Sequence, residues 1–224
     1  MRDTRKSKEY FTMFLEYQYD RILSKKSKLA QCEKSDVDKQ NRINITLMGY
    51  KINALIAEFS SGASTDVLKK SLESCCRTAG SLKFLGYETS IRLLSLIILL
   101  DHYENSANLV RKALSECGED KLIRCLAGYI TDKSISWIGD FLFPDIYDPL
   151  NKVFQSVSQE EQVDALAQYL SGWYQSCAGS SWFDTLENKH NVYYGYWSFE
   201  SAAVAKILDI PPCKLQKYDF FPVL

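Results

Sequence analysis

The sequence predicts an all-α fold, a compact helical bundle in two parts without a substantial β-sheet. Apolar residues recur at three- and four-residue spacing through most of the 224 residues, as one buried face of a helix requires. No stretch alternates apolar and polar residues with the β-branched enrichment that is typical of strands. Because 46% of the residues are hydrophobic and 25% are charged, the chain can bury a sizeable core.

The first two helices are predicted from apolar stripes. One stripe runs from Phe11 to Leu29, and a polar break follows over residues 33–38. A second stripe starts at Ile43. It stops at Gly62, a residue that suits the C-terminus of a helix.

Three further helices complete the first half. Ser64 is a good N-cap for a third helix, whose apolar side ends near Leu82. Residues 91–100 are apolar on nearly all sides, which predicts the central helix of this half. Residues 105–117 form a shorter amphipathic helix.

The composition changes after residue 117. Nineteen of the 29 aromatic residues, and all four tryptophans, lie at or after Tyr129. Residues 137–149 mix aromatics with glycine and proline, which indicates turns. Ser158 and Glu161 form a capping-box pattern at the start of a helix that reaches Cys177. We therefore expect two domains, residues 1–117 and residues 118–224.

The most distinctive stretch is residues 193–200, which read YYGYWSFE. Four aromatics in five positions lead into a predicted helix over residues 198–208, with Glu200 in its first turn. Such a segment either packs in the core or forms a recognition surface. Glu200 is either a buried carboxylate, bonded to a tyrosine hydroxyl or to Trp197 Nε1, or a solvated first-turn charge. Sequence leaves these alternatives open.

Charge and apolar runs exclude several classes of protein. The formal net charge is −1 and the pI is about 6.2, so nothing indicates direct binding to nucleic acid or to an anionic membrane. The strongest apolar run, residues 93–100, is too short to span a bilayer, and no signal peptide is visible. Seven cysteines without framework spacing indicate reduced thiols in a cytoplasmic protein.

Enzyme chemistry finds little support in the sequence. His102 and Glu104 match the H-x-E of zinc deaminases and Pro212 starts a P-C pair, but Gln216 stands where the second cysteine ligand is needed. A pairing of Cys177 with His190 has no sign of activation. We expect no catalytic residues, no metal and no cofactor.

The sequence resembles the PoNi-type immunity proteins in both halves. Residues 194–205, YGYWSFESAAVA, together with Trp182 and His190, are similar to the C-terminal domain of that family. The first half is similar to its N-terminal domain through three stretches, residues 9–11 (EYF), 56–62 (IAEFSSG) and 93–96 (LLSL).

What the resemblance implies is an all-helical bacterial protein that binds and neutralises a cognate PoNe-type DNase toxin. Such toxins are delivered between competing cells, as in type VI secretion, and the metal chemistry belongs to the toxin. The sequence departs from the family pattern at residues 209–212 (DIPP), where an acidic pair is expected. It departs again at residues 220–222 (FFP), which replace a tyrosine-rich ending.

The expected toxin-binding region is acidic. Residues 140–164 contain six acidic residues and one basic residue, Lys152, which gives a local charge of −5. A DNase needs a cationic cleft for the phosphate backbone, which an acidic surface could cover. The alternative is a solvated face with ordinary helix caps. The expected toxin-binding residues, here named the acidic surface, are Asp140, Asp145, Asp148, Glu160 and Asp164.

The family motif is expected to be mainly structural, with direct toxin contact as the alternative. Its residues are Trp182, His190, Tyr194, Gly195, Tyr196, Trp197, Phe199 and Glu200. The expected partner is the cognate toxin, and a homodimer is left open. A different function, a helical adaptor that binds a cellular protein through its aromatic-rich C-terminal half, is the second hypothesis.

Overall fold

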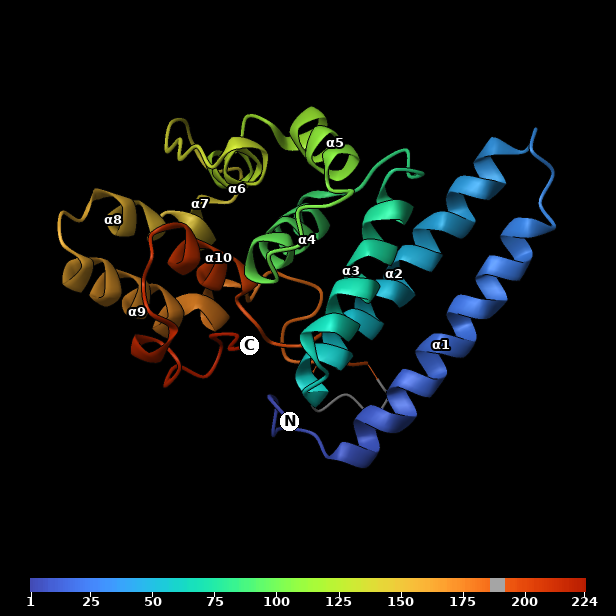
Figure 1. The fold of residues 1–224 in the computed structure, drawn as a ribbon, viewed down its shortest axis with the longest axis horizontal. Coiled ribbons are helices and arrows are strands. Elements are labelled where there is room, and N and C mark those ends of the chain that lie inside the picture. Colours follow the sequence, from blue (N-terminus) through green and yellow to red (C-terminus); the bar gives the residue numbers. More distant parts are fainter. Residues whose placement is uncertain (186–191) are drawn as a thin grey trace.

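A computed structural model describes residues 1–185 and 192–224, and these residues confirm the all-α prediction (Figure 1). They form ten α-helices, one short 3-10 helix and no β-sheet; the sole β-type pairing among them is an isolated bridge between Asp120 and Asp140. The helices are α1 (Lys8–Ala30), α2 (Val37–Ser61), α3 (Thr65–Ala79), α4 (Tyr87–Leu99), α5 (Ala107–Cys117), α6 (Lys121–Asp132), α7 (Pro144–Tyr147), α8 (Leu150–Gln155), α9 (Gln159–Ser176) and α10 (Phe199–Ile207), with η1 at Pro212–Lys214.

Helices α1 and α2 form a hairpin that projects to one side of the molecule (Figure 1). In α1 only Phe11, Phe14 and Gln18 are buried, so most of this helix faces water. Helix α2 begins at Val37, ahead of its apolar stripe, because Asp36 caps it by accepting the N–H of Lys39 at 3.0 Å. It ends where predicted, with Gly62 in the left-handed conformation at φ 90°.

Helix α4 is central, as the sequence predicts. Nine of its 13 residues are buried, and it packs against α3, α5, α6 and α10. It therefore lies between the α1–α3 part and the aromatic-rich part of the molecule (Figure 1). One hydrophobic cluster runs from Phe11 in α1 to Phe221 near the C-terminal end. The division into residues 1–117 and 118–224 stays a prediction.

Helix α6 follows directly on the predicted boundary and was not assigned from the sequence. Asp120 begins it by accepting the N–H of Ile123 at 2.9 Å. After α6, residues 133–143 contain no helix and α7 is a single turn, so the turns predicted for residues 137–149 are present.

Helix α9 begins at the predicted capping box, with one change in the pattern. Ser158 Oγ accepts the N–H of Glu161 at 3.2 Å, as expected. The Glu161 carboxylate, however, accepts the N–H of Val157 at 3.1 Å instead of the N–H of Ser158. The cap thus extends one residue further toward α8.

Candidate functional site

Residues 193–197, here named the aromatic brace, connect α10 to the first half of the molecule. Tyr193 is 2% exposed, and its hydroxyl donates to Asp3 Oδ2 at 2.5 Å. Its ring meets the edge of Phe11 in α1, with centroids 5.0 Å apart. Tyr193 therefore contacts both the N-terminal segment and α1.

Trp197 anchors the other end of the aromatic brace. It is 8% exposed, and its Nε1 donates to Ser60 Oγ at 2.9 Å. Its ring meets the edge of Phe59 at a centroid distance of 5.5 Å. Both partners lie in the last turn of α2, so the family motif contacts the helix end that carries the IAEFSSG stretch.

Gly195 permits the close approach between these two ends. Its φ of 76° lies in the left-handed region, and a Cβ at this position would overlap the side chain of Ile56. Both the backbone conformation and the available space therefore require glycine here.

Glu200 is a buried carboxylate bonded to a tyrosine, one of the alternatives that the sequence left open. It is 5% exposed, and its Oε1 accepts from Tyr169 Oη and from Ser198 Oγ, each at 2.7 Å. Burial raises the pKa of Glu200, although these two hydrogen bonds act in the opposite direction. The alternative bond to Trp197 is wrong, because that indole donates to Ser60.

The remaining motif residues form a stack around a small pocket. Trp182 stacks on Tyr194 with centroids 4.4 Å apart, and the guanidinium of Arg92 lies 4.0 Å from the centroid of the Tyr194 ring. Arg92 also donates to Glu88 at 3.2 Å. These side chains, with Phe199 and Glu200, line a pocket of about 250 Å³. His190 lies outside the described residues.

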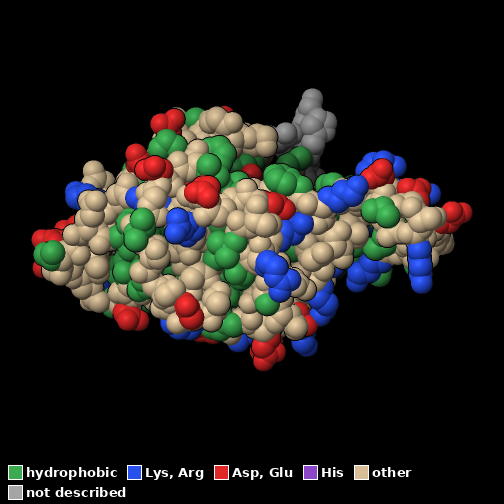
Figure 2. Space-filling model, turned by 90° about the horizontal axis from the view of Figure 1, so that it is seen from above, with side chains coloured by type: hydrophobic (Ala, Val, Ile, Leu, Met, Phe, Trp, Pro, Cys, Tyr) green, Lys and Arg blue, Asp and Glu red, His purple; other side chains and the backbone are tan. Residues whose placement is uncertain are grey.

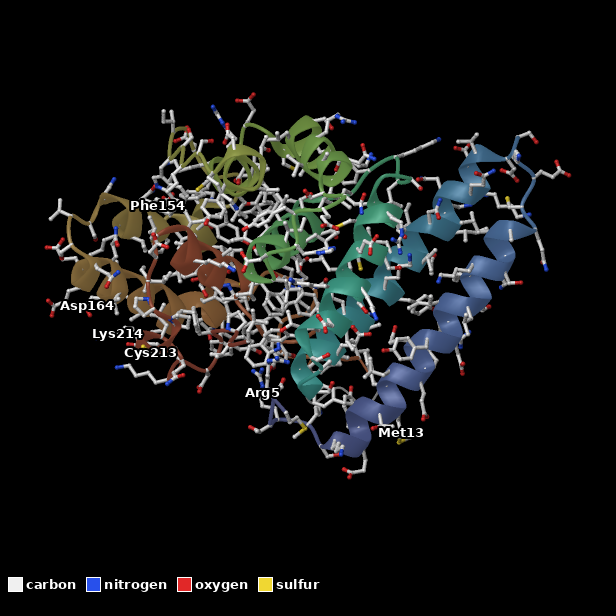
Figure 3. All side chains as sticks on the ribbon, viewed as in Figure 1. Arg5, Met13, Phe154, Asp164, Cys213 and Lys214 are labelled. Atoms are coloured by element: carbon white, nitrogen blue, oxygen red, sulfur yellow. The ribbon has the colours of Figure 1, made fainter. Side chains whose placement is uncertain are left out.

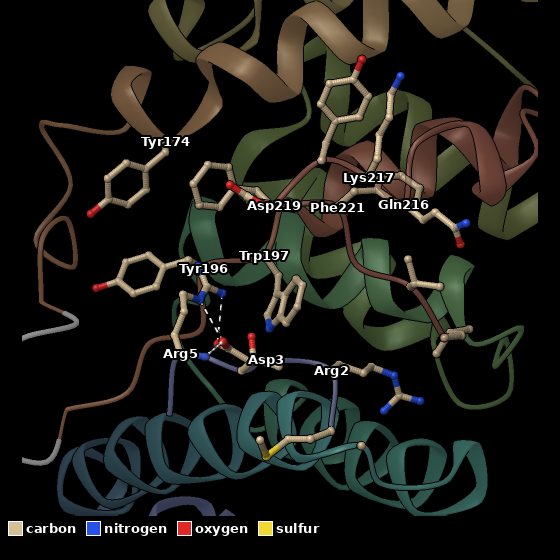
Figure 4. Close-up of a pocket in the computed structure, with 17 residues that line it drawn as sticks. Arg2, Asp3, Arg5, Tyr174, Tyr196, Trp197, Gln216, Lys217, Asp219 and Phe221 are labelled. Atoms are coloured by element: carbon tan, nitrogen blue, oxygen red, sulfur yellow. Dashed lines mark hydrogen bonds and ion pairs between the residues drawn. The ribbon is translucent and has the colours of Figure 1, made fainter. Parts of the chain in front are cut away.

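A larger pocket, of about 900 Å³, lies between residues 1–5 and the C-terminal segment (Figure 4). Arg5 pairs with Asp3 at 2.8 Å and faces the Tyr196 ring, 5.3 Å from its centroid. Burial raises the pKa of Asp3, but the hydrogen bonds from Arg5 and Tyr193 outweigh burial and leave that pKa below its ordinary value. The polar groups of this pocket thus hold the N-terminal segment on the aromatic brace.

All five carboxylates of the acidic surface are exposed. Asp140 lies in the α6–α7 connection, Asp145 lies on α7 and Asp148 caps its C-terminal end. Glu160 and Asp164 lie one turn apart on α9, and Figure 3 shows Asp164 pointing outward at the end of the molecule. Within the described residues none of the five takes part in an ion pair. Figure 2 shows acidic side chains among apolar ones toward the end opposite the α1–α2 hairpin.

Sequence reasoning missed Asp120, which organises the neighbourhood of Asp140. Asp120 is fully buried, and besides capping α6 it accepts the N–H of Leu142 at 2.8 Å and the hydroxyl of Tyr87 at 3.0 Å. The available signal was an aspartate just ahead of an apolar stripe, which is an N-cap pattern. That signal would have predicted the start of α6, though not the contacts to Tyr87 and Leu142.

No metal-binding cluster of His, Cys, Asp and Glu occurs in the part of the chain that the structure describes. Cys177 is buried, and burial raises its pKa to about 12, so this thiol is protonated near neutral pH. None of the helices in residues 1–185 and 192–224 is long and apolar enough to cross a membrane.

Comparison with known protein families matched residues 118–223 to a family model described as PoNe immunity proteins (PoNi), C-terminal. The match does not extend into residues 1–117. Searches of curated proteins and of solved structures gave no match.

Proposed function

Residues 118–223 belong to the C-terminal family of PoNe immunity proteins, and from this premise we propose that the chain protects its producer by binding and neutralising a DNase toxin of the PoNe type. The family implies a cognate PoNe toxin as the partner. In this proposal the toxin arrives from a competing cell, as in type VI secretion, and is met in the cytoplasm. The family match is the observation that carries the proposal.

The proposed mechanism is that the acidic surface covers the basic active-site cleft of the toxin. Exposed carboxylates without ion-pair partners among the described residues supply the required charge. A nuclease cleft binds phosphates through cationic side chains, and carboxylates can take the place of those phosphates. Opposite charges also speed the encounter between the two proteins.

The adaptor alternative has less support. It would present the aromatic-rich half to a cellular protein, but Tyr193, Tyr196 and Trp197 are each less than 9% exposed. The burial of these three rings gives little support to an exposed aromatic binding surface.

Co-expression tests the proposed function. The cognate PoNe toxin is produced in a sensitive host with or without this chain, and survival and co-purification are scored. A catalytically inactive toxin serves as the control for the burden of expression. We expect survival only with the chain, and a complex that co-purifies. Death of cells that contain folded chain at the level of the toxin would contradict the proposal.

A further inference from the structure

Residues 135–143, here named the apolar loop, expose an unusual amount of apolar surface. Ile138 is 70% exposed, and Ile135, Leu142 and Phe143 are each 47–50% exposed. Single exposed apolar side chains are ordinary, but four within nine residues concentrate apolar surface in one connection, and concentrated apolar surface is typical of interaction sites.

The apolar loop is held in place from beneath. The N–H of Lys121 donates to Asp140 O at 2.9 Å, and the N–H of Leu142 donates to Asp120 at 2.8 Å. Trp137 stacks on Phe154 in α8 at a centroid distance of 3.6 Å. These contacts fix both ends of the segment against α6 and α8.

Two aromatic side chains of the apolar loop face the protein, and the residue after each of them faces water. Phe141 is 7% exposed and Trp137 donates to Asn151 Oδ1 at 3.0 Å, so both face the protein. Their neighbours Ile138 and Leu142 face water. A fixed backbone that presents apolar side chains loses little conformational entropy on binding, because the loop is already ordered.

Three carboxylates of the acidic surface lie in or just after the apolar loop. Asp140 lies within the loop, Asp145 lies on α7 and Asp148 caps the C-terminal end of that helix. The nearby cations are Arg124 and Lys133, which are both exposed, and Lys121, which lies over the rings of Trp137 and Phe141 and donates to Asn151. None of them forms an ion pair with the three carboxylates among the described residues, so these carboxylates are available to a cationic partner.

We propose that the apolar loop is the desolvated centre of the toxin contact, and that Asp140, Asp145 and Asp148 form its charged rim. This inference rests on the proposed function and makes it specific. The partner surface is a cationic cleft with an apolar floor on the PoNe toxin. Ile138 and Leu142 enter that floor, while the rim carboxylates meet lysine or arginine side chains around it.

The two parts of this surface act through different forces. Burial of Ile138 and Leu142 strengthens the complex whatever the salt concentration, because the hydrophobic effect involves no ionic screening. Rim carboxylates set the association rate and the salt dependence. A change in the centre therefore lowers affinity and leaves the salt dependence as it was.

The test compares two double variants in binding to purified, catalytically inactive cognate toxin. Ile138→Ser with Leu142→Ser changes the apolar loop, and Met13→Ser with Leu23→Ser is the matched control on α1, where both side chains are 64% exposed. Kd is measured by calorimetry at two salt concentrations. The loop variant loses two central anchors, so its Kd should rise about 30-fold or more, with an unchanged salt dependence. The Kd of the α1 control should stay within about twofold of the wild-type value.

Four results would overturn the inference. A Kd of the loop variant within about threefold of the wild-type Kd would contradict the inference but not the proposed function. If the α1 control loses binding and the loop variant does not, the toxin contact lies on the α1–α2 hairpin instead. Hydrogen exchange on the wild-type complex provides a readout independent of variants, and unprotected amides in residues 135–143 also contradict the inference. A wild-type chain that binds no toxin refutes the proposed function together with it.

Discussion

Single residues show how opposite environments tune two buried carboxylates. Asp3 accepts from Arg5 and Tyr193, and the net effect of burial and these donors lowers its pKa. Glu200 accepts from neutral donors, among them Tyr169 and Ser198, and burial dominates to raise its pKa. The ionised form of Asp3 therefore supports the fold, whereas the ionised form of Glu200 opposes it.

The raised pKa of Glu200 predicts a pH-dependent difference between wild type and Glu200→Gln. A raised pKa means that the folded state holds the proton more tightly than the unfolded state. Glu200 therefore contributes its full stabilisation at pH values below the pKa that it has in the unfolded state. This contribution is lost as pH rises through the pKa that Glu200 has in the folded state. Glutamine keeps an acceptor for Tyr169 and does not titrate.

We therefore expect the Tm of wild type minus the Tm of Glu200→Gln to decrease steadily as pH rises from about 4 toward 8. Thermal unfolding followed by circular dichroism measures both proteins in matched buffers. A difference that is flat, or that grows with pH, would contradict the assigned environment of Glu200.

At the scale of elements, the aromatic brace fixes α10 against α1 and α2. The loss of one brace residue should therefore affect stability before it affects recognition. Trp197→Ala removes a buried indole and the bond to Ser60, with an expected loss of about 3–5 kcal/mol. At about 2–4 °C per kcal/mol for a chain of this size, Tm falls by about 10 °C.

The Tm of Trp197→Ala is measured by thermal unfolding, and its toxin binding is measured at a temperature below that Tm. Phe84→Ala provides a comparison in which a ring that is 64% exposed, outside the brace and the apolar loop, is lost. A Trp197→Ala protein with wild-type stability and no toxin binding would reverse the structural interpretation of the motif.

Helix ends with a clear capping residue were predictable from the sequence. Gly62 and Ser158 fixed the end of α2 and the start of α9, because their roles depend on local backbone chemistry. Residues 137–149 were predicted only as turns. Their shape depends on Asp120 and Asn151, which are distant in sequence, and no local pattern indicates which apolar residues of this stretch face water.

At the scale of the whole molecule, α4 joins the two parts of the chain. It packs against α6 and α10, so residues 118–224 alone would expose the surfaces that α4 covers. Sequence composition predicted a boundary near residue 117, but periodicity does not reveal which helices share a core. The family match covers residues 118–223 and does not show that this part folds alone.

We expect the isolated fragment 118–224 to lack a cooperative thermal transition, and to regain one when it is co-expressed with residues 1–117. Burial of apolar surface on α6 and α10 requires α4, and this burial is the main stabilising term. Near-ultraviolet circular dichroism and calorimetry measure the transition. A fragment that unfolds cooperatively on its own would show that the C-terminal part is an independent domain.

The central claim is that an acidic surface on the C-terminal half binds the toxin. The most direct measurement is the dependence of the toxin Kd on salt for the triple charge reversal Asp145→Lys, Asp148→Lys and Asp164→Lys. A matched triple reversal of Glu16, Asp20 and Asp66, exposed acids of α1 and α3, changes the net charge equally. We predict that the variant with reversals at Asp145, Asp148 and Asp164 binds the toxin more weakly, and with a smaller salt dependence, than the control variant with reversals on α1 and α3. Unchanged affinity and an unchanged salt dependence in the first triple would contradict the claim.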